Sequence, residues 1–163
     1  MRRSNTGLLA AKALVNSEIR VRGKNVEALD LSDLLMPEYR TWLLYPCKGA
    51  AELTLDLVNQ EQTPIQLIVP DGNWRQAAKV YYRHDELKNV QKVMISTPNT
   101  SKFRLLHQHR REGMATLQAI AHAVGIIEGD PVKAELMKLY DLKLKQTLVV
   151  RGLSRRAENW NWG

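Results

Sequence analysis

The sequence predicts an α/β protein with a mostly parallel sheet flanked by helices, and two observations support this. Apolar stretches typical of strands occur at 41–45, 65–69 and 90–96, and amphipathic helical patterns alternate with them. The stretch 65–69 is apolar on both faces, as in a strand buried inside a parallel sheet. Strands that alternate with helices pair in parallel, because each helix returns the chain to the same edge of the sheet. A length of 163 residues fits a single domain over 1–163.

The first half of the chain is expected to contain the following elements. A helix covers 6–16, and a short strand with polar and basic alternation follows at 18–22. The stretch 25–36 is ambiguous between a loop and a short helix. The apolar segment 41–45 is a strand that ends before a proline, which cannot donate to a sheet ladder. The segment 49–58 is expected to begin as a helix.

A second helix with a clear pattern is predicted at 74–84, directly after the 65–69 strand. Its apolar and small residues recur at i, i+3, i+4, i+7 and i+8, which predicts one buried face. These residues are Trp74, Ala77, Ala78, Tyr81 and Tyr82. Charged and polar residues occupy the other face.

The rest of the chain is predicted to contain a strand at 90–96, a helix at 116–127 and a long helix to about residue 146. The pair Asp130-Pro131 is typical of a helix start, with an aspartate N-cap and a proline at the first helical position. The inward-facing residues of that helix are expected to be Val132, Leu136, Leu139 and Tyr140. The segment 146–163 is predicted to be a basic tail that contains tryptophans.

Asp71 and Gly72 occupy a tight turn where the 65–69 strand leads into the 74–84 helix. In open α/β sheets, ligands bind at the carboxyl ends of the strands, so a carboxylate in this turn is placed for chemistry. An aspartate before a helix is also a common N-cap, and glycine is a common turn residue. The residues themselves leave both roles open.

The chain carries a formal net charge of +7, with a sequence pI near 9.7, and such a basic surface attracts phosphate groups. Basic clusters lie at 2–3, 20–24, 102–111 and 151–156. The 102–111 cluster lacks clear periodicity and is interpreted as a loop. It is either a solvated surface or a clamp for RNA phosphates formed by Lys102, Arg104, Arg110 and Arg111.

Other kinds of site find little support in the sequence. Cys47 is the single cysteine, which excludes an internal disulfide within these residues and favours a reducing, cytoplasmic environment. His107 and His109 have no nearby ligand set, so we expect no metal. No apolar run reaches membrane-spanning length, so we expect no membrane partner. The sequence does not determine the oligomeric state, for which a monomer is preferred.

Four segments resemble, in order, the motifs of the DTW-domain family. Asp71-Gly72-Asn73-Trp74 is similar to its Asp-x-Thr-Trp signature, with Asn73 where the family usually has threonine. Arg3-Ser4-Asn5-Thr6-Gly7 is similar to its Arg-x-Ser-Asn-Thr-Gly segment. Leu44-Tyr45-Pro46 is similar to its Leu-Tyr-Pro turn, and Ala115-Thr116-Leu117-Gln118-Ala119 to its Ser-Thr-x-Glu-Ala helix start. The resemblance covers residues 2–145.

This resemblance implies a tRNA-uridine aminocarboxypropyltransferase. Such an enzyme moves the 3-amino-3-carboxypropyl group of S-adenosylmethionine to N3 of a uridine in tRNA. The resemblance also implies a fold related to the SPOUT methyltransferases, whose chain is knotted. Composition cannot show a knot, and the question stays open here.

The chemistry of this transfer and the distribution of charge suggest roles for individual residues. Asp71 would accept the uridine proton, or bind the amino group or the sulfonium of S-adenosylmethionine. Trp74 would form a pocket wall or stack on a flipped uridine. The co-substrate is expected to contact Asn5, Thr6, Leu44, Tyr45, Pro46, Asp71, Gly72 and Thr116. The tRNA is expected to contact Arg3, Lys102, Arg104, Arg110 and Arg111.

The sequence departs from the family pattern in two places. Ala115 and Gln118 replace serine and glutamate, which leaves only the back half of a capping box, so we expect Thr116 to take over as the cap. The family's upstream segment, often with a cysteine cluster and an initial strand, does not precede the first motif, and we expect a trimmed or short variant. Two alternatives therefore stay open: an RNA methyltransferase that uses S-adenosylmethionine, and a noncatalytic RNA-binding protein.

Overall fold

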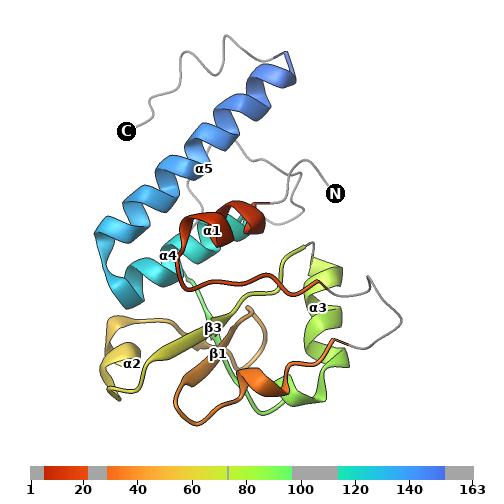
Figure 1. Cartoon of the computed structure of the whole chain (residues 1–163), viewed down its shortest axis with the longest axis vertical. Helices are drawn as coiled ribbons and strands as arrows, with labels where there is room; N and C mark the ends of the chain where they lie inside the picture. The colour runs from red at the N-terminus through yellow and green to blue at the C-terminus, as the bar shows by residue number, and fades with distance from the viewer. Residues whose placement is uncertain (1–5, 22–28, 73, 97–113, 153–163) are drawn as a thin grey trace. The chain divides into compact units, whose positions relative to one another are not determined.

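The computed structural model of the chain describes residues 6–21, 29–72, 74–96 and 114–152 (Figure 1). These residues form two compact units. The sheet unit consists of the described residues from Leu14 to Ser96, and the helical unit combines residues 6–13 with residues 114–152.

The sheet unit contains a four-stranded sheet in which every pair of neighbours is parallel. The strand order is β2-β4-β1-β3, with β1 (Arg40–Leu44) and β4 (Gln91–Met94) in the centre. The short strand β2 (Ala51–Glu52) and the strand β3 (Ile65–Ile68) are the two outermost strands. The sheet confirms the predicted parallel α/β architecture, while the relation to the SPOUT fold and its knot stays a prediction.

Four short helical segments complete the sheet unit: η1 (Ser32–Leu34), α2 (Leu55–Asn59), α3 (Trp74–Arg83) and η2 (Asp85–Leu87). The helix α2 starts after Thr54, whose hydroxyl oxygen accepts a hydrogen bond from the Leu57 amide at 3.2 Å. One apolar cluster holds the unit together, and α3 contributes Ala77 to it. Its other buried members are Leu31, Leu43, Tyr45, Leu87 and Val90.

Arg40 joins the start of β1 to the end of α2. Its guanidinium donates hydrogen bonds to four backbone oxygens and lies 5.1 Å from the centre of the Trp42 ring, two residues along the same strand. The acceptors are the carbonyl oxygens of Thr63 (3.1 Å), Leu57 (3.4 Å), Val58 (2.7 Å) and Glu61 (2.8 Å). The last carbonyls of a helix have no partner inside the helix, so a cation at this end stabilises it.

Two secondary-structure predictions for the sheet unit are wrong. Residues 49–58 were expected to begin as a helix, but Ala51 and Glu52 form β2, and the helix starts only at Leu55. The pairing of Ala51 with Val93 decides this, and that partner lies far away in the sequence. Residues 18–22 were expected to form a strand, but residues 18–21 belong to no helix or strand. The polar side chains of this stretch form ion pairs instead.

The helical unit consists of α1 (Gly7–Ala13), α4 (Thr116–Glu128) and α5 (Asp130–Val150). In Figure 1, α4 and α5 form a hairpin, and α1 packs against α4. The hairpin turns at Gly129, whose φ of +107° is a conformation that other residues rarely adopt. The predicted helices are confirmed, although α1 ends before residue 16.

The helix α5 is longer than predicted. It continues to Val150 and buries a stripe with a spacing of four residues, formed by Leu136, Tyr140, Leu144 and Leu148. Val132 and Leu139, also expected to face inward, are only half-buried. The first residues of the predicted 146–163 tail are therefore helical, because Leu148 gains burial by extending the stripe. Across the described ranges, no helix is both long and apolar enough to span a bilayer.

Candidate functional site at the carboxyl edge of the sheet

The carboxyl ends of β1 and β3 bring five of the predicted site residues to one edge of the sheet. The two strands are parallel neighbours, with Leu43 opposite Ile68, so both chains leave the sheet at this edge. β1 leads into Tyr45 and Pro46, and β3 leads into Asp71 and Gly72. Leu44 and Tyr45 are buried, whereas Asp71 and Gly72 are exposed.

The turn after β3 needs a glycine at position 72. The φ of Gly72 is +136°, and a Cβ atom built there would lie 2.7 Å from Oε1 and 3.0 Å from Cβ of Gln76. A larger residue would therefore be strained in its backbone and would press against the first turn of α3. Trp74, the first residue of α3, follows Asp71 by three positions. The Asp71 side chain is exposed, and both capping and a chemical role stay open for it.

A ladder of aromatic rings extends from Tyr45 along α3. The ring centroids of Tyr45 and Tyr81 lie 5.7 Å apart, and those of Tyr81 and Tyr82 lie 4.9 Å apart. Burial raises the pKa of the Tyr45 hydroxyl, and the nearby Tyr82, Cys47 and Tyr81 raise it further. The Tyr45 phenol therefore stays protonated at neutral pH, inside the apolar cluster of the sheet unit.

Tyr82 corrects the prediction for the buried face of α3. Ala77 is buried and Tyr81 is half-buried as expected, but Tyr82 is 71% exposed. At 100° per residue, the position i+8 lies about 80° from position i, so Tyr82 sits at the border of the apolar stripe. That border position is the sequence signal that could have placed Tyr82 in solvent.

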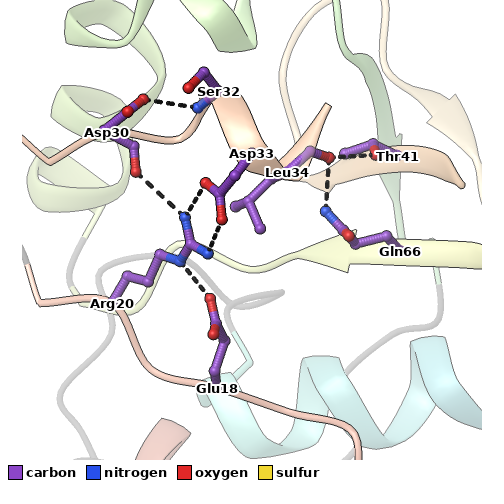
Figure 2. A network of polar contacts seen from close by, with 8 residues as sticks. All are labelled: Glu18, Arg20, Asp30, Ser32, Asp33, Leu34, Thr41 and Gln66. Atoms are coloured by element: carbon purple, nitrogen blue, oxygen red, sulfur yellow. Dashed lines mark hydrogen bonds and ion pairs between the residues drawn. The ribbon is translucent and has the colours of Figure 1, made fainter. Parts of the chain in front are cut away.

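Arg20 belongs to a polar network of the sheet unit and not to a free basic cluster (Figure 2). Its guanidinium donates to both carboxylate oxygens of Asp33, at 2.6 and 2.5 Å, and also to Glu18. A further bond of 3.3 Å reaches the carbonyl oxygen of Asp30. The hydrogen bonds to Asp33 and then to Glu18 raise the pKa of Arg20, and Arg20 lowers the pKa of Asp33. Arg20 therefore stabilises the fold and is a poor candidate for binding phosphate.

The same network fastens η1 to the sheet. The Leu34 carbonyl oxygen accepts hydrogen bonds from the Thr41 hydroxyl at 2.9 Å and from the Gln66 side-chain amide at 2.8 Å. Thr41 is in β1 and Gln66 is in β3, so one carbonyl joins the loop to both strands (Figure 2). This attachment holds the two strands whose ends carry Tyr45 and Asp71.

Thr6 and Thr116 belong to the helical unit. Thr116 is the first residue of α4, and Thr6, which precedes α1, contacts the same helix end through a hydrogen bond. The Gln118 side chain accepts a hydrogen bond from the Ala115 amide at 3.0 Å, which confirms the predicted back half of a capping box. Ala115 has no side-chain acceptor for the front half, and the Thr6 hydroxyl oxygen replaces it by accepting from the Leu117 amide at 3.2 Å. The expectation that Thr116 is the cap is wrong, because Thr116 is already the first residue of the helix.

We expect Thr6→Val to lower the free energy of unfolding by about 1 kcal/mol, the usual cost of losing a helix cap. Thr6 is 3% exposed, so valine fits its volume but leaves the Leu117 amide without this acceptor. Urea unfolding would measure the change. Thr6→Ser keeps the hydroxyl and serves as the control. Equal stability of the valine and serine variants would contradict the capping role.

Several predicted site residues lie outside the described residues. They are Arg3, Asn5, Lys102, Arg104, Arg110 and Arg111, together with His107, His109 and the tail beyond residue 152. Trp74 is described as the first residue of α3, and its role as pocket wall or stacking partner stays a prediction. Within the part of the chain that the structure describes, no group of three or more His, Cys, Asp or Glu side chains could hold a metal.

Comparison with known proteins identifies the family. The family model of the DTW domain matches residues 1–148. This chain belongs to the DTW-domain family. Of the segment that resembles its signature, Asp71 and Gly72 follow β3 at the carboxyl edge of the parallel sheet, and Trp74 is the first residue of α3.

Three curated relatives of this DTW-domain chain carry the name tRNA-uridine aminocarboxypropyltransferase 2. The Macaca fascicularis protein is 28% identical over 88 residues, which is 54% of this chain and 30% of the relative. The Mus musculus protein is 27% identical over 88 residues, with the same coverage. The Drosophila melanogaster protein is 26% identical over 110 residues, which is 68% of this chain and 39% of the relative. The chain thus spans about a third of the length of these relatives. No solved structure matches it significantly.

Proposed function

We propose that this DTW-domain protein transfers the 3-amino-3-carboxypropyl group of S-adenosylmethionine to N3 of a uridine in tRNA. The observation that carries the proposal is the exposed carboxylate of Asp71 in the DTW turn, at the edge of a parallel sheet where ligands of α/β proteins bind. The names of the three relatives support tRNA modification as its setting. A cytoplasmic location, where tRNA is abundant, is part of the same proposal.

The reaction makes one N–C bond and breaks one C–S bond. N3 of uridine attacks the γ-carbon of the alkyl chain, the sulfonium leaves as a neutral thioether, and the N3 proton must go to a base. The Asp71 carboxylate would accept that proton if it lies within hydrogen-bond reach of N3. In the alternative role, Asp71 holds the amino group or faces the sulfonium with its negative charge. Both roles place N3 close to the γ-carbon, and such proximity is the main catalytic gain.

The other residues of the edge suit the binding of an adenosine group. Leu44 and Tyr45 are buried at the end of β1, and the exposed Pro46 follows them. Side chains of such low polarity are typical of the walls of nucleotide pockets. Thr6 belongs to the helical unit, where its hydroxyl oxygen accepts from the Leu117 amide, and its contact with S-adenosylmethionine stays a prediction.

Mass spectrometry of the uridines in tRNA tests the proposal. tRNA is incubated with the full chain, with and without S-adenosylmethionine, and calorimetry measures the binding of S-adenosylmethionine and its thioether product. The expected product is 3-(3-amino-3-carboxypropyl)uridine. A methylated nucleoside would instead support the RNA methyltransferase. Unmodified tRNA that still binds the protein would support the noncatalytic RNA-binding protein. Failure of calorimetry to detect either ligand would reject the proposed site.

The cluster Lys102, Arg104, Arg110 and Arg111 is proposed to clamp tRNA phosphates. Replacing all four by alanine should weaken tRNA binding and reduce the slope of log affinity against log salt by about 0.7 to 0.9 per lost phosphate contact. Affinity for S-adenosylmethionine should stay unchanged. The control replaces Lys88 and Lys138, whose ammonium groups already pair with Asp85 at 2.7 Å and Glu135 at 2.6 Å. A salt slope equal to that of the control would identify the cluster as a solvated loop.

A further inference from the structure

Tyr82, the exposed tyrosine of α3, packs against the row of aromatic rings formed by Tyr81 and Tyr45. Tyr82 is 71% exposed, and its ring rests against Tyr81, which in turn contacts the buried Tyr45. The Lys92 ammonium lies 5.2 Å from the centre of the Tyr81 ring and makes a cation–π contact with it. Tyr82 is therefore a large aromatic surface in solvent, on a rigid support that begins at the end of β1.

Two positive charges lie close to Tyr82 along α3. Lys79 precedes Tyr82 by three residues and Arg83 follows it, and both are exposed. Lys79 and Arg83 are four residues apart, a spacing at which like charges destabilise a helix. Of the acids that follow α3, Asp85 pairs with Lys88, and Glu86 Oε2 lies 3.9 Å from His84 Nδ1. In the described ranges, Lys79 and Arg83 have no acidic partner.

This combination fits a nucleotide better than a protein or a lipid surface. A base has a flat face that stacks on an aromatic ring, and its phosphate is attracted by neighbouring cations. A protein or membrane partner would need several exposed apolar side chains together. Of the α3 side chains that the structure describes, Tyr82 is the one exposed large hydrophobic residue.

We propose that Tyr82, with Lys79 and Arg83, forms a stacking platform for an unpaired nucleotide of the substrate RNA. The proposal rests on the proposed function for its class of partner. Tyr82 stacks on the base, and the two cations contact the adjoining phosphates. Because the ladder begins at Tyr45, the platform connects RNA binding to the edge of the sheet that carries Asp71.

Binding of a fluorescein-labelled oligouridylate and of tRNA, followed by fluorescence anisotropy, tests the platform. Tyr82→Ala should weaken binding about 5- to 100-fold, the usual range for losing one stacked base. Tyr82→Phe keeps the ring and should bind like the parent. The matched control is Tyr39→Ala, which removes another exposed tyrosine of the same unit and should leave affinity unchanged. Affinity for S-adenosylmethionine should be the same in all three variants.

The two cations give a second, independent measurement. Lys79→Ala and Arg83→Ala should each reduce the salt slope for the single-stranded probe by about 0.7, if each loses one phosphate contact. Weak binding by both Tyr82→Ala and Tyr82→Phe, or no weakening by Tyr82→Ala, would overturn the stacking role. So would a dimer, measured by sedimentation, that Tyr82→Ala dissociates while RNA affinity stays constant.

The outcome for the platform can be separated from that for the enzyme. If the parent modifies no uridine but the pattern of Tyr82 variants holds, the proposed transfer fails and the RNA platform stands. If Tyr82→Ala transfers the group to tRNA with unchanged affinity and rate, the platform fails and the proposed function stands. Circular dichroism of each variant checks that the fold is retained.

Discussion

Asp71→Asn is expected to lower the rate of uridine modification by about 100-fold or more, the usual contribution of a positioned general base. Asparagine has the same shape but accepts no proton and carries no negative charge toward a sulfonium. Asp71 is exposed, three positions before α3, and asparagine keeps its shape, so we expect the unfolding transition to stay close to that of the parent. Single-turnover transfer to tRNA, measured by mass spectrometry, gives the rate.

The same variant separates the two chemical roles of Asp71. If the carboxylate accepts the N3 proton, the maximal rate falls while affinity for S-adenosylmethionine is kept. If the carboxylate holds the amino group, affinity for S-adenosylmethionine falls as well. The control is Asp56→Asn, which changes an exposed aspartate in the first turn of α2 and should leave transfer unaffected. A rate for Asp71→Asn within a few-fold of the parent would exclude both roles.

Arg40→Ala is expected to destabilise the protein by about 2–4 kcal/mol, since charged hydrogen bonds contribute about 1.5–3 kcal/mol each and are not additive. The side chain is only 13% exposed, and its guanidinium serves the carbonyl oxygens at the end of α2. Alanine leaves these acceptors without their donor and also removes the contact with the Trp42 ring. Urea unfolding followed by tryptophan fluorescence would measure the loss.

Two further variants test whether the hydrogen bonds of Arg40 cause this loss of stability: Arg40→Lys and the control Arg83→Ala. Lysine keeps the positive charge but lacks the planar guanidinium that donates to several carbonyl oxygens at once. We therefore expect an intermediate loss of stability. Arg83 is exposed, and its replacement should change stability by less than about 0.5 kcal/mol. If Arg40→Ala were as stable as Arg83→Ala, the cap on α2 would contribute nothing to the fold.

Elements whose residues follow a clear local pattern were predicted well from the sequence. The strands at β1, β3 and β4 follow from apolar runs, and α3, α4 and α5 follow from helical spacing. Two short segments failed because their conformation depends on distant partners. Ala51 and Glu52 form a strand only because β4 lies beside them, and residues 18–21 follow the ion pairs that Arg20 makes with Glu18 and Asp33.

The candidate site also has features that local sequence patterns predict and features that depend on distant partners. Parallel strands were enough to predict that Tyr45 and Asp71 leave the sheet at one edge, and the order β2-β4-β1-β3 confirms that their strands are neighbours. The sequence could not assign Thr6 to the Leu117 amide, because 111 residues separate the two. Nor could it tell that Arg40 caps α2, whereas the border position of Tyr82 on the helical stripe was a signal of its exposure.

The sequence by itself determined the class of fold, the positions of the main helices and strands, and the family, since each depends on local patterns of side chains. Only the tertiary structure decided which charges and hydroxyls are engaged. Arg20, Arg40 and Thr6 all have types and neighbours that would suit a ligand, yet each bonds to groups of the protein. Lys79 and Arg83 look the same in the sequence and remain exposed. The reason is physical: a buried polar group must find a partner, and the fold alone brings that partner within reach.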